Sequence, residues 1–431
     1  MSTMDFTKGK TNELPQSTDW EVLRQPIQVG KKTINNRIAY QAMEGCDGTA
    51  LGAPDVLTFR RYKRFAAGGP GVIWLEATAV VPEGRANPRQ LYICKETLDD
   101  FKRLCETIKE TCMRENGHEP FVSVQLTHSG RHSKPHGTPE PIIAYRNPYF
   151  EQKVSVTDAN IISDDELDRL GETLINGAIL AEQAGFDAAD IKACHGYLLC
   201  ELLSAYSRPG KYGGSFENRT RLLRESVAGA VKACSSDFVI SSRLNIYDGF
   251  PYPYGFGVAP DCGVTPDYTE AKQMVSDLAN EGIGLLNFTM GNPYVNPHVN
   301  RPSKTGPYVT DEPAITGVTR MLTGIAEVTT AVKDKVPVIC SGLSYLGEEA
   351  PNVAAGCISE EWFQVAGFGR ESFAYPNFAR DICKKGEIDK QQMCITCSKC
   401  TELMRSGGTT GCIIRDSKVY SPLYKQYVLK K

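Results

Sequence analysis

The sequence lacks any apolar run that approaches the roughly 18 residues of a transmembrane helix. Its N-terminus carries Asp5, Lys8, Lys10 and Glu13 where a secretory leader would need an apolar stretch. Positive charge is not in excess either, because the formal net charge is −3 and the pI is about 6.2. This balance provides no broad basic field for nucleic acid or anionic membranes. We therefore expect a cytoplasmic protein whose partner is a small molecule, with no nucleic-acid or membrane partner.

Internal repeats and low-complexity tracts are also missing, and no G-x-G-x-x-G motif follows a strand late in the chain. Cysteine, by contrast, is plentiful, with 15 residues. A cytoplasmic chain of 431 residues keeps most of its cysteines reduced, so we expect no disulfide framework. Four of the cysteines crowd into residues 394–412, and this cluster requires an explanation of its own.

Short apolar, β-branched runs alternate with longer helical patterns from about residue 37 to residue 385. Such alternation indicates βα units, and near-continuous apolar runs are typical of parallel strands covered by helices. Eight runs can be placed, at 37–43, 71–77, 121–126, 188–192, 238–244, 285–289, 336–340 and 362–368. Eight units predict an α/β fold of the (β/α)8 TIM-barrel class.

The domain organisation follows from this pattern. We expect an N-terminal extension at 1–20, a barrel at 21–385 and a short cysteine-rich segment at 386–431. Ser163 and Glu166 form a capping box that predicts the start of one barrel helix. Long connections follow several strands, and in a barrel such connections build the active site. They lie at 127–160, 195–214, 245–264 and 290–310.

The clustered cysteines have the spacing C-x2-C-x2-C-x11-C. Thiolates grouped in this way bind either an iron-sulfur cluster or zinc. The predicted ligands are Cys394, Cys397, Cys400 and Cys412.

Several segments resemble the old yellow enzyme, or NADH:flavin oxidoreductase, family. The most specific segments are QLTHSGR at 125–131 and HGYLLCELLSAYSRPGKYGGSFENRTR at 195–221. The family's first two strands correspond to NRIAYQAME at 36–44 and EATAVVPEGR at 76–85. The similarity covers about residues 20 to 385 and is nearest to the FMN-barrel and cluster part of 2,4-dienoyl-CoA reductase-like enzymes. It implies FMN as the cofactor.

The resemblance also implies which residues hold FMN. Gln125 and Arg243 match positions at the pyrimidine edge of the flavin, where negative charge develops on reduction and preorganised donors stabilise it. Backbone N–H groups and a cation after the seventh and eighth strands form the usual barrel phosphate site. The residues expected there are Ser341, Gly342, Gly369 and Arg370; Ala42, Met43, Glu44 and Ala77 complete the expected FMN site.

Catalysis in the family uses two side chains that bind the substrate carbonyl and a tyrosine that donates a proton. The matching residues here are Lys192, His195 and Tyr197. Lysine departs from the family pattern at the first of these positions. Three roles are open for Lys192: it polarises a carbonyl, it pairs with a carboxylate, or it points away as a structural lysine. Tyr197 suits a general acid because a phenol remains protonated at neutral pH.

A second departure places Glu44 where the family has a threonine or cysteine beside the flavin. An ionised carboxylate there disfavours the reduced, anionic flavin. Glu44 is therefore neutral, paired with Lys192 or rotated away. If the alignment shifts, Cys46 takes the position instead.

The resemblance makes a 4Fe-4S cluster the expected occupant of the four cysteines, with structural zinc as the alternative. In larger relatives the barrel continues into FAD- and NAD-binding domains, whereas only 19 residues follow Cys412 here. We therefore expect a separate reductase or ferredoxin-like protein to deliver electrons. Direct reduction of FMN by NAD(P)H is the competing route.

Together these features predict an FMN-dependent ene-reductase that acts on an α,β-unsaturated carbonyl compound. One alternative is a flavin and iron-sulfur dehydrogenase that works in the oxidative direction on amines, which the positive charge of Lys192 disfavours. Another is a non-catalytic electron-carrier subunit. The sequence leaves the substrate and the oligomeric state open, a homo-oligomer included.

Overall fold

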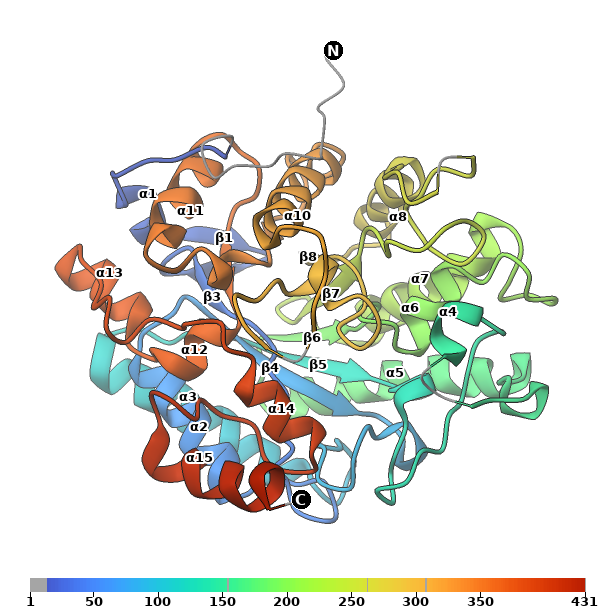
Figure 1. The fold of residues 1–431 in the computed structure, drawn as a ribbon, viewed down its shortest axis with the longest axis horizontal. Helices are drawn as coiled ribbons and strands as arrows, with labels where there is room; N and C mark the ends of the chain where they lie inside the picture. The colour runs from blue at the N-terminus through green and yellow to red at the C-terminus, as the bar shows by residue number, and fades with distance from the viewer. Residues whose placement is uncertain (1–13, 153–154, 262, 307, 431) are drawn as a thin grey trace.

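Eight parallel strands form a closed ring in the computed structural model, which describes residues 14–152, 155–261, 263–306 and 308–430 (Figure 1). The first seven strands pair in sequence order, and the eighth pairs with the first. The Cys340 N–H donates to the carbonyl of Val365 over 3.1 Å and closes the remaining gap. The strands are β3 (Ile38–Tyr40), β4 (Val72–Ala79), β5 (Phe121–Thr127), β6 (Ala188–Ile191), β7 (Val239–Asn245), β8 (Leu285–Thr289), β9 (Val338–Ile339) and β10 (Ala366–Phe368). The predicted TIM-type barrel is confirmed, with every expected strand at its place in the sequence.

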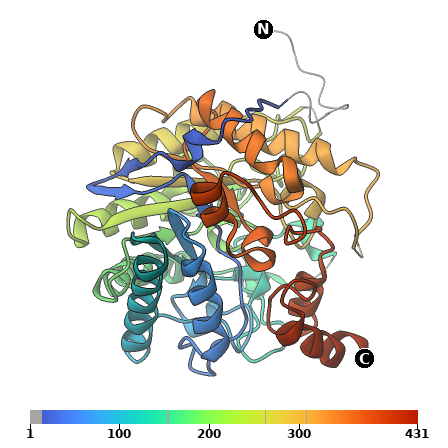
Figure 2. The same ribbon diagram turned by 90° about the vertical axis from the view of Figure 1, so that its left-hand side faces the viewer.

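One long helix follows each strand and packs on the outside of the ring (Figures 1 and 2). These helices are α2 (Val56–Ala67), α3 (Leu98–Asn116), α5 (Asp164–Gln183), α7 (Phe216–Ala233), α8 (Thr269–Asn280), α10 (Ala314–Thr329), α11 (Ala350–Ser359) and α13 (Phe378–Lys385). The capping box at Ser163 and Glu166 begins α5, as predicted. None of the helices within the described ranges is long and apolar enough to cross a bilayer.

Shorter elements occupy the connections and the C-terminal segment. They are α1 (Glu21–Arg24), α4 (Pro148–Glu151), α6 (Leu198–Leu203), α9 (Pro297–Asn300), α12 (Arg370–Ala374), α14 (Lys399–Arg405), α15 (Ser417–Tyr424), the single 3-10 turns η3 (Pro82–Gly84), η4 (Gly130–His132), η5 (Asp158–Asn160), η6 (Leu343–Tyr345) and η7 (Gly347–Glu349), and the π-helical turn η8 (Lys425–Leu429). Residues 1–13 of the expected N-terminal extension, which include the leader region judged from sequence, lie outside the described residues.

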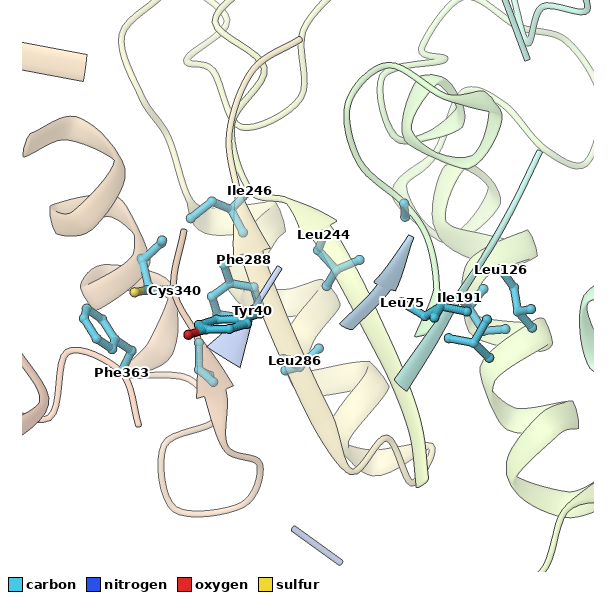
Figure 3. Close-up of a cluster of buried hydrophobic side chains, with 14 of the residues drawn as sticks. Tyr40, Leu75, Leu126, Ile191, Leu244, Ile246, Leu286, Phe288, Cys340 and Phe363 are labelled. Atoms are coloured by element: carbon cyan, nitrogen blue, oxygen red, sulfur yellow. The ribbon is translucent and has the colours of Figure 1, made fainter. Parts of the chain in front are cut away.

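Alternation along the strands separates the two faces of the ring. Outward side chains such as Leu75, Leu126 and Leu286 join the large core beneath the helices (Figure 3). Inward side chains such as Val72 and Trp74 form a smaller apolar cluster inside the barrel. A hairpin of β1 (Ile27–Val29) and β2 (Lys32–Ile34), which the sequence analysis did not predict, packs against that inner cluster. The amino end of the barrel is thus sealed with apolar side chains, and polar groups collect at the carboxyl end.

A bulge in β4 shifts the register between Leu75 and Ala77. The shift frees the carboxylate of Glu76 to accept the Gly45 N–H over 2.6 Å and to pair with the buried Arg61 of α2. Arg61 also pairs with the buried Asp47. This ion cluster holds the segment that follows β3, and with it Glu44, over the open end of the barrel.

The C-terminal segment docks on α2 beside this cluster, as the red α14 and α15 show near the blue α2 (Figure 1). Asp416 accepts two hydrogen bonds of 2.7 and 2.9 Å from Arg60 and also pairs with Arg64. The Thr410 N–H donates to the carbonyl of Gly45 over 2.7 Å. The segment is therefore fixed to the same part of the chain that carries Glu44.

Replacing Arg61 with Met tests the buried ion cluster. The change leaves two buried carboxylates without a cation, so we expect it to lower the free energy of unfolding by about 3–5 kcal/mol. The midpoint of urea unfolding measures the effect. Arg103→Met is the matched control, because Arg103 pairs with Asp100 at the exposed surface. Equal midpoints for the two variants would show that the cluster does not stabilise the fold.

Candidate active site

A pocket opens at the carboxyl ends of the barrel strands, where barrel enzymes hold their active sites. It encloses about 1070 Å³ measured out to its mouth. Every residue proposed above for the cofactor or for catalysis lines it. These residues are Ala42, Met43, Glu44, Ala77, Gln125, Lys192, His195, Tyr197, Arg243, Ser341, Gly342, Gly369 and Arg370.

Buried polar groups form the floor of the pocket. Asp190 accepts hydrogen bonds from Gln125 Nε2 over 2.6 Å and from Trp74 Nε1 over 2.7 Å. Arg243 Nη2 donates to Ser341 Oγ over 3.2 Å, while its Nε is buried and has no hydrogen-bond partner in the described structure. Burial lowers the pKa of Arg243, and the nearby Asp190 carboxylate opposes that shift. An electron-rich pyrimidine edge of a flavin fits this donor.

The residues of the expected phosphate site line the same pocket, and Ser341 among them accepts the hydrogen bond from Arg243. Arg370 Nη2 donates to the carbonyl of Pro302 over 2.7 Å, and its Nη1 is buried without a partner. Gly342 has a φ of +98°, a conformation that side chains other than glycine rarely adopt. Gly367 is required by packing instead, because a Cβ there would lie 2.0 Å from the carbonyl oxygen of Cys340. The free guanidinium N–H beside these close backbone approaches fits a phosphate group.

Tyr197 lies at the centre of the catalytic residues. Its hydroxyl donates to Glu44 Oε1 over 2.8 Å and lies 3.1 Å from the hydroxyl of Tyr294. Burial, reinforced by the Glu44 carboxylate, raises the pKa of Tyr197 well above its usual value. The phenol therefore keeps its proton at neutral pH.

Glu44 itself lines the pocket, whereas the Cys46 thiol accepts a hydrogen bond from Asn87 over 3.1 Å, outside the pocket.

Lys192 is buried with its ammonium 3.6 Å from the centre of the Tyr197 ring. In the described part of the chain it forms no ion pair with a carboxylate, so the pairing with Glu44 considered from sequence is absent. Burial lowers the pKa of Lys192. A cation over an aromatic face is stabilised by the ring but remains available to a polar ligand.

His195 stands at a strained position of the chain, with a φ of +66°. Its backbone N–H donates to Asn245 Oδ1 over 3.2 Å, which holds the turn in place. Burial, with Arg243 and Lys192 as positive neighbours, lowers the pKa of His195 well below its usual value. The imidazole is therefore neutral at pH 7 and can donate one hydrogen bond to a carbonyl.

Sequence reasoning indicated the connection after β8 as part of the site but did not name its lining residues, which include Tyr294, Asn300 and Arg301. Thr401, Met404, Arg405 and Thr410 come from the C-terminal segment. No spacing in the sequence indicated that residues among the clustered cysteines reach the barrel mouth.

The four clustered cysteines line a second cavity of about 390 Å³. Arg370 lines this cavity as well as the barrel pocket, so the two spaces adjoin at one side chain. Across the described residues, no three or more His, Cys, Asp or Glu side chains are arranged to hold a single metal ion. The remaining described cysteines are unpaired thiols distributed through the fold.

The fold is similar to that of a solved 2-naphthoyl-CoA reductase in complex with 2-naphthoyl-CoA. The TM-score is 0.74 at 20% identity, and the match covers 92% of this chain and 57% of that one. This likeness establishes the shared architecture.

Sequence comparison is more specific. The NADPH dehydrogenase of Halalkalibacterium halodurans is 38% identical over 169 residues, which cover 39% of this chain and 46% of that enzyme. The NADPH dehydrogenase of Geobacillus sp. (strain WCH70) is 35% identical over 245 residues, which cover 54% of this chain and 68% of that enzyme. A family model, described as NADH:flavin oxidoreductase / NADH oxidase, matches residues 22–256. The chain therefore belongs to the NADH:flavin oxidoreductase / NADH oxidase family, as its resemblance to old yellow enzyme predicted.

Proposed function

We propose that the protein is an FMN-dependent ene-reductase that reduces the C=C bond of an α,β-unsaturated carbonyl compound. The observation that carries this proposal is the single pocket in which unpaired donors suited to FMN face Lys192, His195 and Tyr197. Arg243 would hold the pyrimidine edge and Arg370 the phosphate. FMN, once bound, supplies the hydride for the β-carbon.

The residues on the substrate side divide the remaining work. Lys192 and the neutral His195 donate hydrogen bonds to the carbonyl oxygen and stabilise the negative charge that develops there. The Tyr197 hydroxyl gives its proton to the α-carbon. Its contacts with Glu44 and Tyr294 fix the hydroxyl and provide a path by which the phenolate regains a proton.

The oxidation of amines is a weaker proposal for the same pocket. Five cationic side chains line the space against one carboxylate, Glu44, so an ammonium substrate would meet repulsion. A carbonyl substrate gains from the same charges.

We further propose that Cys394, Cys397, Cys400 and Cys412 hold a 4Fe-4S cluster that passes electrons to FMN. Two observations support it: the four cysteines line one cavity, and Arg370 borders both this cavity and the proposed phosphate site. Ile395 and Ile414, 48% and 37% exposed, flank the cysteines and suit contact with a separate reductase or ferredoxin-like donor. Direct reduction by NAD(P)H remains the competing route.

Arg243→Ala tests the flavin site. We expect purified wild-type protein to carry about one FMN per chain, and the variant to retain less FMN or to show a lower flavin potential, because a charge-assisted donor is lost. Flavin absorbance per protein and a potentiometric titration measure both effects. Arg103→Ala, at the exposed surface, should behave as wild type. Full FMN retention with an unchanged potential would remove Arg243 from the flavin site.

Tyr197→Phe tests the proton donor. Flavin reduction should be unaffected, while reoxidation by an enone should slow by about 10²- to 10⁴-fold, because only protonation loses its acid. Anaerobic stopped-flow absorbance separates the two half-reactions. Tyr252→Phe, at an exposed tyrosine, is the control. Equal reoxidation rates in wild type and Tyr197→Phe would assign the proton to another group.

Cys397→Ser tests the cluster and the route of electrons. We expect wild-type protein prepared without oxygen to contain iron and acid-labile sulfide, and the variant to lose both, while Cys234→Ser, at a half-buried cysteine outside the cluster, retains them. In stopped-flow mixing with NADH or NADPH, wild-type flavin should stay oxidised unless a protein donor is added. Flavin bleaching at catalytic rates without a donor protein would contradict the relay.

A further inference from the structure

Two arginines on the outer wall of the pocket have no role in the reaction proposed above. Arg301 comes from the connection after β8, and Arg405 comes from α14 in the C-terminal segment. Of the other cationic side chains of the pocket, Arg243 lies on β7, Lys192 directly follows β6 and Arg370 begins α12.

The two guanidinium groups are held close together by neutral partners. Arg301 Nη1 donates to Thr401 Oγ1 over 2.7 Å, and Arg405 Nη2 donates to the carbonyl of Pro293 over 2.6 Å. The Arg405 guanidinium lies 5.4 Å from the centre of the Tyr294 ring. In the described ranges, neither arginine forms an ion pair with a carboxylate.

Like charges placed together without a counter-ion are unfavourable. Burial, followed by the positive charges of Arg405 and Arg370, lowers the pKa of Arg301 to about 10. Glu44, the one carboxylate that lines the pocket, is hydrogen-bonded to Tyr197. Arg301 therefore lies beside other positive charges without a carboxylate counter-ion, whereas Arg405 is exposed to solvent at the edge of the pocket.

The FMN site proposed above does not include Arg301 or Arg405. Arg243 and Arg370 have unpaired N–H groups that suit the flavin edge and its phosphate, and Lys192 lies over the ring of Tyr197. Arg301 and Arg405 line the same pocket, and none of the roles proposed above uses them. Planar guanidinium groups bind a carboxylate through paired hydrogen bonds.

We propose that Arg301 and Arg405 bind an ionised carboxylate of the substrate, so that the enzyme acts on α,β-unsaturated carbonyl compounds that carry a second, acidic group. The inference rests on the proposed ene-reductase function and adds the charge of its substrate. The C-terminal segment then has a part in specificity, since it supplies Arg405 directly and positions Arg301 through Thr401.

Monomethyl fumarate and dimethyl fumarate test this inference, because they share one activated alkene and differ by a single negative charge at pH 7. Wild-type enzyme should prefer the monoester. In Arg405→Met and Arg301→Met, kcat/KM for the monoester should fall roughly 10- to 100-fold, the range for a lost charged hydrogen bond, while the diester changes by less than about twofold. Arg114→Met, at an exposed arginine on α3, is the matched control.

Equilibrium binding gives a readout independent of turnover. Monomethyl succinate and dimethyl succinate cannot be reduced, and their binding is followed through the flavin absorbance of the oxidised holoenzyme. The monoester should bind wild type more tightly than the diester, and both arginine variants should abolish that difference.

Two outcomes would overturn the inference. One is an equal loss of kcat/KM for the two fumarates. The other is loss of FMN from the variants, which would assign the arginines to the cofactor. Failure of both fumarates to reoxidise reduced flavin would count against the ene-reductase function instead. The succinate titration would still decide whether the arginines select a carboxylate.

Discussion

The buried carboxylate of Asp190 is the constraint on which the pocket depends. It lies inside the barrel on β6, where burial raises its pKa and the donors around it oppose that shift. It accepts from the Trp74 indole below, from the Gln125 amide beside it and from the Arg243 backbone N–H over 2.7 Å. The Asp190 side chain thus links β6 to β4, β5 and β7. It does so at the level of the barrel where the apolar interior side chains end and polar groups begin.

The hydrogen bond to Asp190 determines which groups of the Gln125 amide remain free to bind a ligand. One N–H of its amide is used by Asp190, so the carbonyl oxygen and the second N–H remain for a partner. A pyrimidine edge, which has both donors and acceptors, matches that combination. Arg243 is held by its backbone on the same carboxylate, and its guanidinium extends toward Ser341 with one N–H unused.

The positions of the strands were predictable from sequence because buried parallel strands are apolar. The candidate site residues came from the resemblance to the family, and the structure brings them into one pocket. The hairpin β1–β2 escaped prediction because its three-residue strands are too short to show a period. The bulge at Glu76 was equally hidden, since it depends on the buried Arg61. Arg405 could not be placed in the pocket at all, because its position follows from the docking of Asp416 onto α2.

The two departures from the family pattern, Lys192 and Glu44, were considered from sequence as possible partners of each other. In the structure both meet Tyr197 instead, the ammonium against its ring face and the carboxylate at its hydroxyl. The cation favours the phenolate that would follow proton transfer, and the anion opposes it. The acidity of the tyrosine therefore depends on both residues, and neither can be interpreted alone.

The docking of the cysteine segment on α2 has a consequence for any use of this barrel as a scaffold. Thr401, Met404, Arg405 and Thr410 form part of the pocket wall, and Thr410 is bonded to the carbonyl of Gly45. A protein shortened at the end of α13 would keep all eight strands but lose that wall. The flavin site would then be open to bulk water on that side. Grafting the catalytic chemistry into another protein therefore requires the last 46 residues of the chain as well as the ring.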